Sequence, residues 1–330
     1  MKYINLFDTQ AAYDAAEKYY PNTSYIEASD EVVYQAIDPD YYLKQYLTFE
    51  ALESGTFSLT VPADVNSTYM TSISYSTDNG TTWVDTTINN TKQTITTPTI
   101  AKGGKVLWKG IGNATAKNTA YCSYFSSTGN FNASGNIMSL LYGDNFQNQT
   151  TLPNSMNSFA KLFGNETKLI SVLNLTLPAT TLTEYCYTYM FQNCTSLTTA
   201  PELPATTLAG QCYAFMFQNC TSLTTAPELP ATTLKNSCYI NMFENCTALT
   251  TAPTIPSQIN SYNYCFQNMY KNCSSLNSIT VLITRNNGLS VFSNWVQGVA
   301  STGTFTKASS LSLSTGDSGI PSGWTVVDIN

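Results

Sequence analysis

Histidine is absent from this 330-residue chain, and charged residues make up only 11% of it, against about 25% in a typical soluble domain. Without histidine the chain lacks the commonest general base, the Ser-His and Cys-His nucleophile pairs and every histidine-containing metal site. Arg285 is the sole arginine, and the net charge is -7. The chain therefore has no basic stripe and no paired arginines for phosphate. We expect neither a common hydrolase mechanism nor nucleic acid as a partner.

Long apolar runs are missing as well. The N-terminal MKYINLFDTQ has no apolar run of about seven residues behind a basic start, which a signal peptide needs. No stretch approaches the roughly 18 consecutive apolar residues of a membrane span. The sequence thus predicts a protein without a membrane span that folds where it is made. The nine cysteines are odd in number, and without an export signal we expect them to be reduced thiols.

A segment that recurs every 26 residues is the most informative feature. Near-identical copies begin at Leu177, Leu203 and Leu229, a looser copy begins at Ile255, and residues 152–176 resemble a worn copy. Periods of 20 to 50 residues are typical of stacked supersecondary units. We therefore predict a solenoid of about five repeats over residues 152–283.

Each repeat has a pattern that suggests a helix followed by a strand. In the first copy Cys186, Tyr187, Met190 and Phe191 have the spacing of one or two helical turns packed on a core. The Ser-Leu-Thr-Thr-Ala-Pro stretch after them is β-branched and closed by prolines, which favours a short extended strand. Strand and helix are thus expected to alternate along the stack.

Paired cysteines eight residues apart accompany each repeat and raise the question of a metal site. Zinc sites favour closer pairs and often histidine, so we interpret the thiols as a ladder of small buried side chains. In the worn copy Ser158 and Glu166 replace them. An asparagine before the second cysteine is expected to cap the backbone through its side chain. The predicted structural residues of the repeats are Cys186, Cys194, Cys212, Cys220, Cys238, Cys246, Cys265, Cys273, Asn193, Asn219 and Asn245, with Asn272 in the looser copy.

The Cys-x-x-x-Met-Phe-x-Asn-Cys-Thr-Ser-Leu pattern with its proline-bounded strand resembles the BspA-like leucine-rich repeat. The resemblance covers about residues 152–283. Members of that family are largely exported surface adhesins and interaction proteins of gut and oral bacteria. The resemblance implies a leucine-rich-repeat solenoid that presents a binding surface.

The N-terminal half has a different pattern. A helix is expected from Asp8 or Thr9 to about Tyr19, followed by short strands near 25–26 and 32–34. From about Tyr46, short alternating strands with Gly and Asn turns favour an immunoglobulin-like β-sandwich. Residues 76–83 fit the Asp-box hairpin, with Asp78 and Gly80 in the turn and Trp83 packed inward as structural residues.

The opening INLFDTQAAYDAA, the PNTSYIEASDEVVY segment, the YLTFEAL strand and the GNIMSLLYGDNF link together resemble head fibre proteins of crAss-like bacteriophages that infect Bacteroides. The resemblance implies a virion protein that is made in the host cytoplasm, attaches to the capsid by its N-terminus and displays its repeats outward. The expected partners are a capsid or other virion protein, a host-surface glycan or protein, and further copies of the chain in a trimer.

The predicted fold is therefore mixed α/β and multidomain. It comprises an attachment segment with anchor helix and strands (1–42), a β-sandwich (43–130), a linker and cap (131–151), the leucine-rich-repeat solenoid (152–283) and a C-terminal cap (284–330). The last of these includes Trp324.

A binding face is predicted at the positions that differ between otherwise similar copies. Exposed aromatic and amide groups suit carbohydrate or protein surfaces. The candidate ligand-binding residues are Tyr185, Tyr189, Gln211, Phe215, Asn236 and Asn241. A glycosidase would have to use Glu202 and Glu228, which share a repeat position, but a solvated pair is the simpler interpretation.

We predict a non-enzymatic virion structural protein, without cofactor or metal, that displays a repeat surface for host-cell or mucosal glycans or proteins. The alternative is an exported BspA-like adhesin of the bacterial surface.

Overall fold

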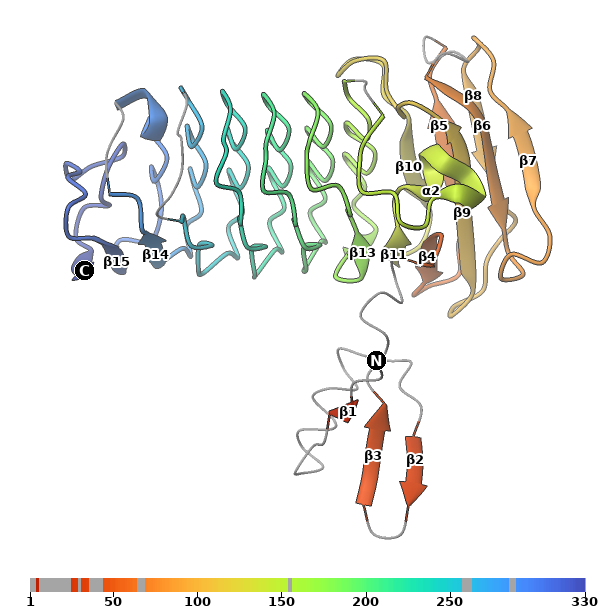
Figure 1. Ribbon diagram of the computed structural model, residues 1–330, viewed down its shortest axis with the longest axis horizontal. Helices are drawn as coiled ribbons and strands as arrows, with labels where there is room; N and C mark the ends of the chain where they lie inside the picture. Colours follow the sequence, from red (N-terminus) through yellow and green to blue (C-terminus); the bar gives the residue numbers. More distant parts are fainter. Residues whose placement is uncertain are drawn as a thin grey trace.

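The computed structural model describes residues 4–5, 25–28, 31–35, 44–63, 69–153, 156–256, 263–284 and 289–329. In this part of the chain the regular structure is almost all β, with one short α-helix (Figure 1). The strands form several separate sheets. The predicted mixed α/β leucine-rich-repeat solenoid is therefore wrong.

The first sheet belongs to the N-terminal segment. It is antiparallel with the order β1-β3-β2, made of β1 (Ile4–Asn5), β2 (Tyr25–Ala28) and β3 (Glu31–Gln35). The strands predicted near residues 25–26 and 32–34 are thus confirmed. The helix predicted from Asp8 or Thr9 to Tyr19 lies outside the described residues.

Two further sheets, formed mainly by residues 47–136, pack face to face. The larger has the order β12-β11-β4-β9-β6-β7, with β13 also paired to β11, and the smaller has the order β10-β5-β8. The alternating segments that begin at residues 47, 55, 72, 92 and 105 predicted strands, and β4, β5, β6, β8 and β9 lie on them. The bounds are β4 (Leu47–Ala51), β5 (Phe57–Val61), β6 (Met70–Ser76), β7 (Val84–Thr87), β8 (Gln93–Thr96), β9 (Lys105–Gly112), β10 (Tyr124–Ser127), β11 (Phe131–Asn136), β12 (Leu169–Ser171) and β13 (Leu175–Thr176).

An aromatic cluster joins these two sheets to the repeats. Phe49 of β4 lies 4.8 Å from Phe125 of β10 and 5.8 Å from Phe163 of the first repeat, measured between ring centroids. β11, which the sequence placed in a linker, pairs antiparallel with β4 and parallel with β12 and β13 of the first repeat. One continuous hydrophobic core therefore runs from Leu47 to Trp324.

The repeats follow one another as a row of stacked coils (Figure 1). Within residues 156–256 and 263–284 they contain no helix, so the helix predicted at Cys186 to Phe191 is wrong. The reason is that every fourth residue is left-handed: φ is 57° at Tyr185, 58° at Tyr189 and 61° at Asn193. A non-glycine residue in this conformation costs roughly 1–2 kcal/mol and does not continue an α-helix. The same positions are left-handed in the neighbouring coils, at Asn157, Lys161, Asn165, Gln211, Phe215, Asn219, Ser237, Asn241, Asn245, Tyr264, Asn268 and Asn272.

The backbone N–H groups of this segment alternate between two kinds of acceptor. The N–H of Tyr187 donates to the carbonyl oxygen of Cys212 in the next coil at 3.0 Å, whereas the N–H of Thr188 donates to Tyr185 of its own coil at 3.2 Å. The next coil repeats this pattern, since Tyr213 donates to Cys238 at 3.1 Å and Ala214 to Gln211 at 3.2 Å. Half of the N–H groups thus build the turns, and the other half hold neighbouring coils together.

In the three near-identical copies the proline-bounded segment makes isolated bridges and not the predicted strands, whereas strands form at this repeat position in the worn first copy (β12) and in the fourth copy (β14, Ser278–Val281). Thr207 forms parallel bridges with Thr181 and Thr233, and Thr225 forms one with Thr251. Proline has no N–H to donate, so prolines close to these threonines keep the ladder from lengthening.

Inside the coils, two columns of stacked aromatic rings run along the row. Neighbouring rings lie 5.4 to 5.9 Å apart between centroids, and most are tilted by 16° or less. One column is Phe159, Tyr187, Tyr213, Tyr239, Phe266 and Phe292, and the other is Phe163, Phe191, Phe217, Phe243, Tyr270 and Trp295. Each coil therefore buries its aromatic side chains against the coils on either side.

The C-terminal end forms a parallel sheet with the order β14-β15-β16, made of β14 (Ser278–Val281), β15 (Thr304–Ala308) and β16 (Thr325–Ile329). Trp324, predicted to lie in the cap, is buried, and its indole N–H donates to the carbonyl oxygen of Ala300 at 2.7 Å. Among the described residues, no helix is long and apolar enough to cross a membrane.

Candidate functional site

The positions predicted to bind a ligand lie mostly at the left-handed residues of the coils. Tyr185, Tyr189, Gln211 and Phe215 all have φ between 53° and 58°, and all four are half-buried. Because a left-handed residue interrupts the inward-facing Cys, Tyr, Met and Phe positions, its side chain reaches the surface of the turn. At these two repeat positions the side chains of the first two near-identical copies therefore lie half-buried at the surface of the turns.

Side chains of adjacent coils pair at these positions. The Nε2 atom of Gln211 donates a hydrogen bond to the Tyr185 hydroxyl at 3.1 Å. The rings of Tyr189 and Phe215 stack with their centroids 4.7 Å apart and their planes 16° from parallel. These four residues, called here the Tyr185 patch, are thus brought together by the stacking of two coils.

The two asparagines predicted as ligands belong to the third copy and differ from one another. Asn236 is exposed. Asn241 is only 7% exposed, and its Nδ2 atom donates to Glu244. Asn241 is therefore already engaged within its coil, whereas Asn236 faces solvent.

The asparagines that recur before the second cysteine of each copy form a hydrogen-bonded ladder between coils. Nδ2 of Asn219 donates to Oδ1 of Asn193 at 2.6 Å, and Nδ2 of Asn245 donates to Oδ1 of Asn219 at 2.7 Å. Asn165 and Asn272 extend the ladder at its two ends. The sequence predicted that these side chains cap the backbone. Their side-chain hydrogen bonds run instead from amide to amide along the row.

A second polar ladder, which was not predicted from the sequence, runs along the coils. Gln192 donates to Gln218, Gln218 donates to Glu244, and Lys271 lies 3.8 Å from the Glu244 carboxylate. These four residues share one repeat position, so the succession of amide, amide, acid and base in one column was the available signal. In both ladders the polar side chains of one coil find their hydrogen-bond partners in the neighbouring coils.

The eight cysteines of the repeats, predicted as a ladder of small buried side chains, and Cys122 lie in the interior. All nine are free and buried. The Sγ atoms of Cys194, Cys220 and Cys246 each donate to a phenylalanine carbonyl oxygen of the preceding coil at 3.1 Å. Burial raises the pKa of the Cys194 thiol well above its ordinary value. Among the described residues, no group of three cysteine, aspartate or glutamate side chains is placed to hold a metal ion.

We expect no thiol of the folded protein to react with a disulfide reagent at neutral pH. Burial denies the reagent access, and the raised pKa of thiols such as Cys212, about 12, keeps them protonated. A thiol assay should release nothing from the native chain and nine equivalents after denaturation. Rapid reaction of even one equivalent in the native state would contradict the buried ladder.

In the worn first repeat, Glu166 occupies the position of a cysteine and is buried. Its two carboxylate oxygens accept the N–H groups of Ser127 at 2.8 Å and Lys168 at 2.7 Å. Burial raises the pKa of this carboxyl. Glu166 thus has a structural role, because its carboxylate connects the end of β10 to the first coil.

The Asp-box forms the turn between β6 and β7. Oδ1 of Asp78 accepts the Thr82 N–H at 2.9 Å and the Ser76 hydroxyl at 2.7 Å, and Oδ2 accepts the Thr82 hydroxyl at 2.6 Å. These hydrogen bonds to Thr82 and Ser76 lower the pKa of Asp78 to about 2. Gly80, with φ of 86°, takes a conformation that L side chains rarely adopt. The carboxylate therefore holds the hairpin together.

A cluster around Lys109 was not predicted. The Lys109 ammonium lies 2.8 Å from Asp144 and 4.1 Å from the centroid of the Trp83 ring. The Tyr46 hydroxyl donates to Asp144 at 2.7 Å, and the Tyr46 ring meets Trp83 edge to face at 5.0 Å. The ion pair between Lys109 of β9 and Asp144 connects β9 to the segment that follows α2 (Ser139–Tyr142).

This cluster predicts two opposite pH dependences. Burial and Asp144 raise the pKa of Tyr46 to about 12, and the bonds from Lys109 and Tyr46 lower the pKa of Asp144. The stabilising contribution of Asp144 is therefore present above its ordinary pKa and lost as the pH falls through the lowered value. That of Tyr46 is present below pH 10 and lost between pH 10 and about 12.

We expect the Tyr46 13Cζ resonance, identified as the signal that Tyr46→Phe removes, to titrate near pH 12. Asp144→Asn should move that midpoint downward, because it removes the negative charge beside the phenol. A midpoint near 10 in the unaltered protein would show that the hydroxyl does not bond Asp144 in solution.

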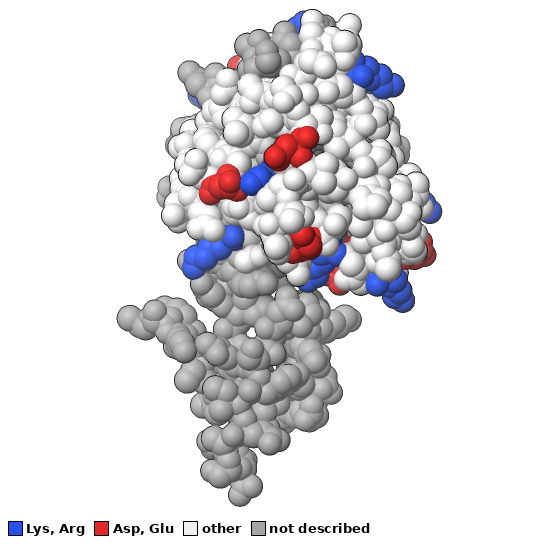
Figure 2. Space-filling model, turned by 90° about the vertical axis from the view of Figure 1, so that its right-hand side faces the viewer, with Lys and Arg blue, Asp and Glu red and all other residues white. Residues whose placement is uncertain are grey.

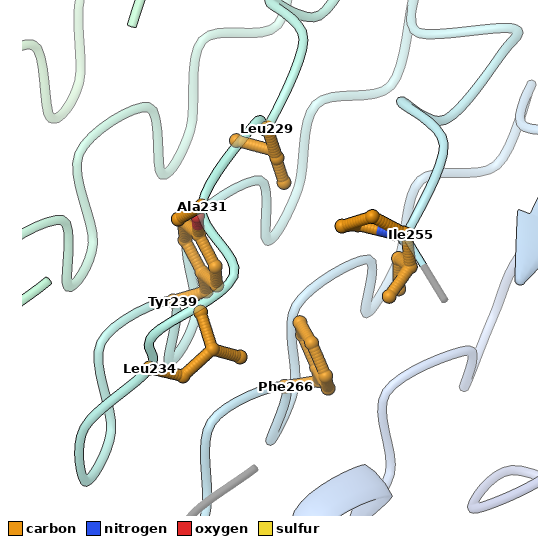
Figure 3. Close-up of a pocket in the computed structure, with 7 residues that line it drawn as sticks. Leu229, Ala231, Leu234, Tyr239, Ile255 and Phe266 are labelled. Atoms are coloured by element: carbon orange, nitrogen blue, oxygen red, sulfur yellow. The ribbon is translucent and has the colours of Figure 1, made fainter. Parts of the chain in front are cut away.

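A pocket between two coils is lined by Leu229, Ala231, Leu234, Tyr239, Ile255, Pro256 and Phe266, which are apolar apart from one hydroxyl (Figure 3). Glu202 and Glu228 are exposed on the proline-bounded segment and are not among the residues that line this pocket. The face in Figure 2 is largely uncharged, with a few scattered Lys, Asp and Glu side chains.

No known family model matches the chain, and no curated protein or solved structure is significantly similar to it.

Proposed function

We propose that the chain is a non-enzymatic structural protein of a virion, attached through its N-terminal segment and displaying the row of coils as a binding arm. The resemblance of INLFDTQAAYDAA and GNIMSLLYGDNF to phage head fibre proteins suggests the location. The observation that carries the binding role is the Tyr185 patch: near-identical coils differ at surface side chains, two pairs of which meet across adjacent coils.

The architecture suits display. Each coil is joined to the next by backbone hydrogen bonds, stacked rings and two side-chain ladders. An arm held in this way presents its surface groups in fixed positions, which lowers the entropic cost of binding. Several copies on one particle, as in the proposed trimer, would add avidity.

Mass spectrometry of density-purified phage particles, set against the host envelope fraction, tests the location. We expect peptides of this chain at a fixed ratio to the major capsid protein, including peptides that retain Met1 or Lys2. Recovery in the envelope alone, with a processed N-terminus, would overturn the virion assignment and indicate a cell-surface adhesin.

A further inference from the structure

We propose that the Tyr185 patch, together with Glu184, binds a neutral, hydroxyl-rich glycan through its polar groups rather than by stacking a sugar on an aromatic face. This proposal deepens the binding role given above and rests on it. It concerns the first two near-identical coils, where the aromatic and amide side chains meet.

The ring geometry argues against face-on stacking. The ring centroids of Tyr189 and Phe215 lie 4.7 Å apart and their planes are 16° from parallel, so each ring covers one face of the other. Backbone hydrogen bonds place Lys161 on the far side of Tyr189 and Asn241 on the far side of Phe215, in the same column of the neighbouring coils. The half-buried pair thus offers ring edges, which give apolar contact area without an open platform.

The polar groups beside the rings have hydrogen-bonding capacity to spare. The Tyr185 hydroxyl accepts from Gln211, so its own hydrogen remains available to a ligand, as do the Gln211 Oε1 lone pairs. Glu184 is exposed and adds two carboxylate acceptors. Together they supply acceptors for sugar hydroxyl hydrogens and one strong donor for a hydroxyl oxygen.

Gly210 lies beside the Glu184 carboxylate. A Cβ atom built there would be in ordinary contact with the Glu184 Oε1 atom at 3.5 Å and with the Asn236 carbonyl oxygen at 3.9 Å. A side chain larger than a methyl group at this position would therefore crowd the carboxylate, and glycine leaves it open to a ligand on that side.

Charge selects among glycans. Glu184 is the charged residue of the proposed site, and an acidic sugar placed beside it would meet its negative carboxylate. A neutral sugar can donate its hydroxyl hydrogens to the same carboxylate. The patch should therefore discriminate against sialylated and sulfated chains.

The test is the full chain on an array of neutral, sialylated and sulfated oligosaccharides, followed by titration of the best binder. Tyr185→Phe, which removes one hydroxyl, and Gln211→Ala should each weaken binding at least tenfold. Tyr264→Phe is the matched control: this tyrosine has the same repeat position and a left-handed φ of 60°, but lies in the fourth copy. It should leave binding unchanged, and all three variants should keep the melting temperature within a few degrees.

Binding confined to acidic glycans, binding to none, or an equal loss with Tyr264→Phe would overturn the proposal. The proposed virion role fails separately, because incorporation into particles is measured by mass spectrometry and does not depend on Tyr185 or Gln211. A chain found in virions that binds no oligosaccharide would thus retain its location and lose this ligand class.

Discussion

Replacing Phe217 by alanine is expected to lower the free energy of unfolding by about 3–5 kcal/mol. The Phe217 ring is fully buried and stacks between Phe191 at 5.4 Å and Phe243 at 5.6 Å. Alanine would leave a cavity that touches three coils at once. The repeating backbone hydrogen bonds hold the coils in place and limit how far they can close it. Chemical denaturation followed by circular dichroism would measure the loss.

Thr206→Ala is a suitable control for that experiment. Thr206 is exposed in a nearby part of the coils, so its substitution should stay within about 0.5 kcal/mol. A loss below about 1 kcal/mol for Phe217→Ala would show that the rings do not pack as a continuous column in solution.

Replacing Asn219 by alanine should have the second largest effect, roughly 3–4 kcal/mol. Two hydrogen bonds of the asparagine ladder disappear, to Asn193 at 2.6 Å and from Asn245 at 2.7 Å, each worth about 1 kcal/mol. In addition alanine must adopt the left-handed φ of 63° that Asn219 has. Asparagine tolerates this conformation better than alanine does.

Asn219→Gly separates the two contributions. Glycine also loses both ladder hydrogen bonds but takes the left-handed conformation readily, so it should be less destabilising than alanine by about 1 kcal/mol. The stability order should be asparagine, then glycine, then alanine. An alanine variant as stable as the glycine variant would mean that position 219 is not left-handed.

Much of the packing could be predicted from the sequence because it depends on period and polarity. The 26-residue repeat, the buried Cys, Met and Phe positions and strands β4, β5, β6, β8 and β9 follow from where apolar residues recur. The local conformation of the coils could not, because apolar groups at i, i+1, i+4 and i+5 fit both a helix and a series of four-residue turns. Such spacing alone does not separate the two.

A signal for the turns was nevertheless in the sequence. Asn241 and Asn245 in one copy, and Asn268 and Asn272 in the next, stand four residues apart, and asparagine is the residue other than glycine that best tolerates the left-handed region. The Tyr185 patch was found for a different reason, namely that its positions vary between copies. Its internal pairing was not predictable, since it depends on which side chains the stacking brings together.

The alternating hydrogen bonds between coils bear on how the arm could change its length. At each step the same repeat position donates a backbone hydrogen bond to the same acceptor position of the following coil. Tyr187 donates to Cys212, and Tyr213 in turn donates to Cys238. Duplication or deletion of one whole 26-residue unit would therefore rejoin matching partners, with Asn193 meeting Asn245 if the middle copy were removed. The length of the row of coils can thus evolve in steps of one coil, without any change to the segments on either side of it.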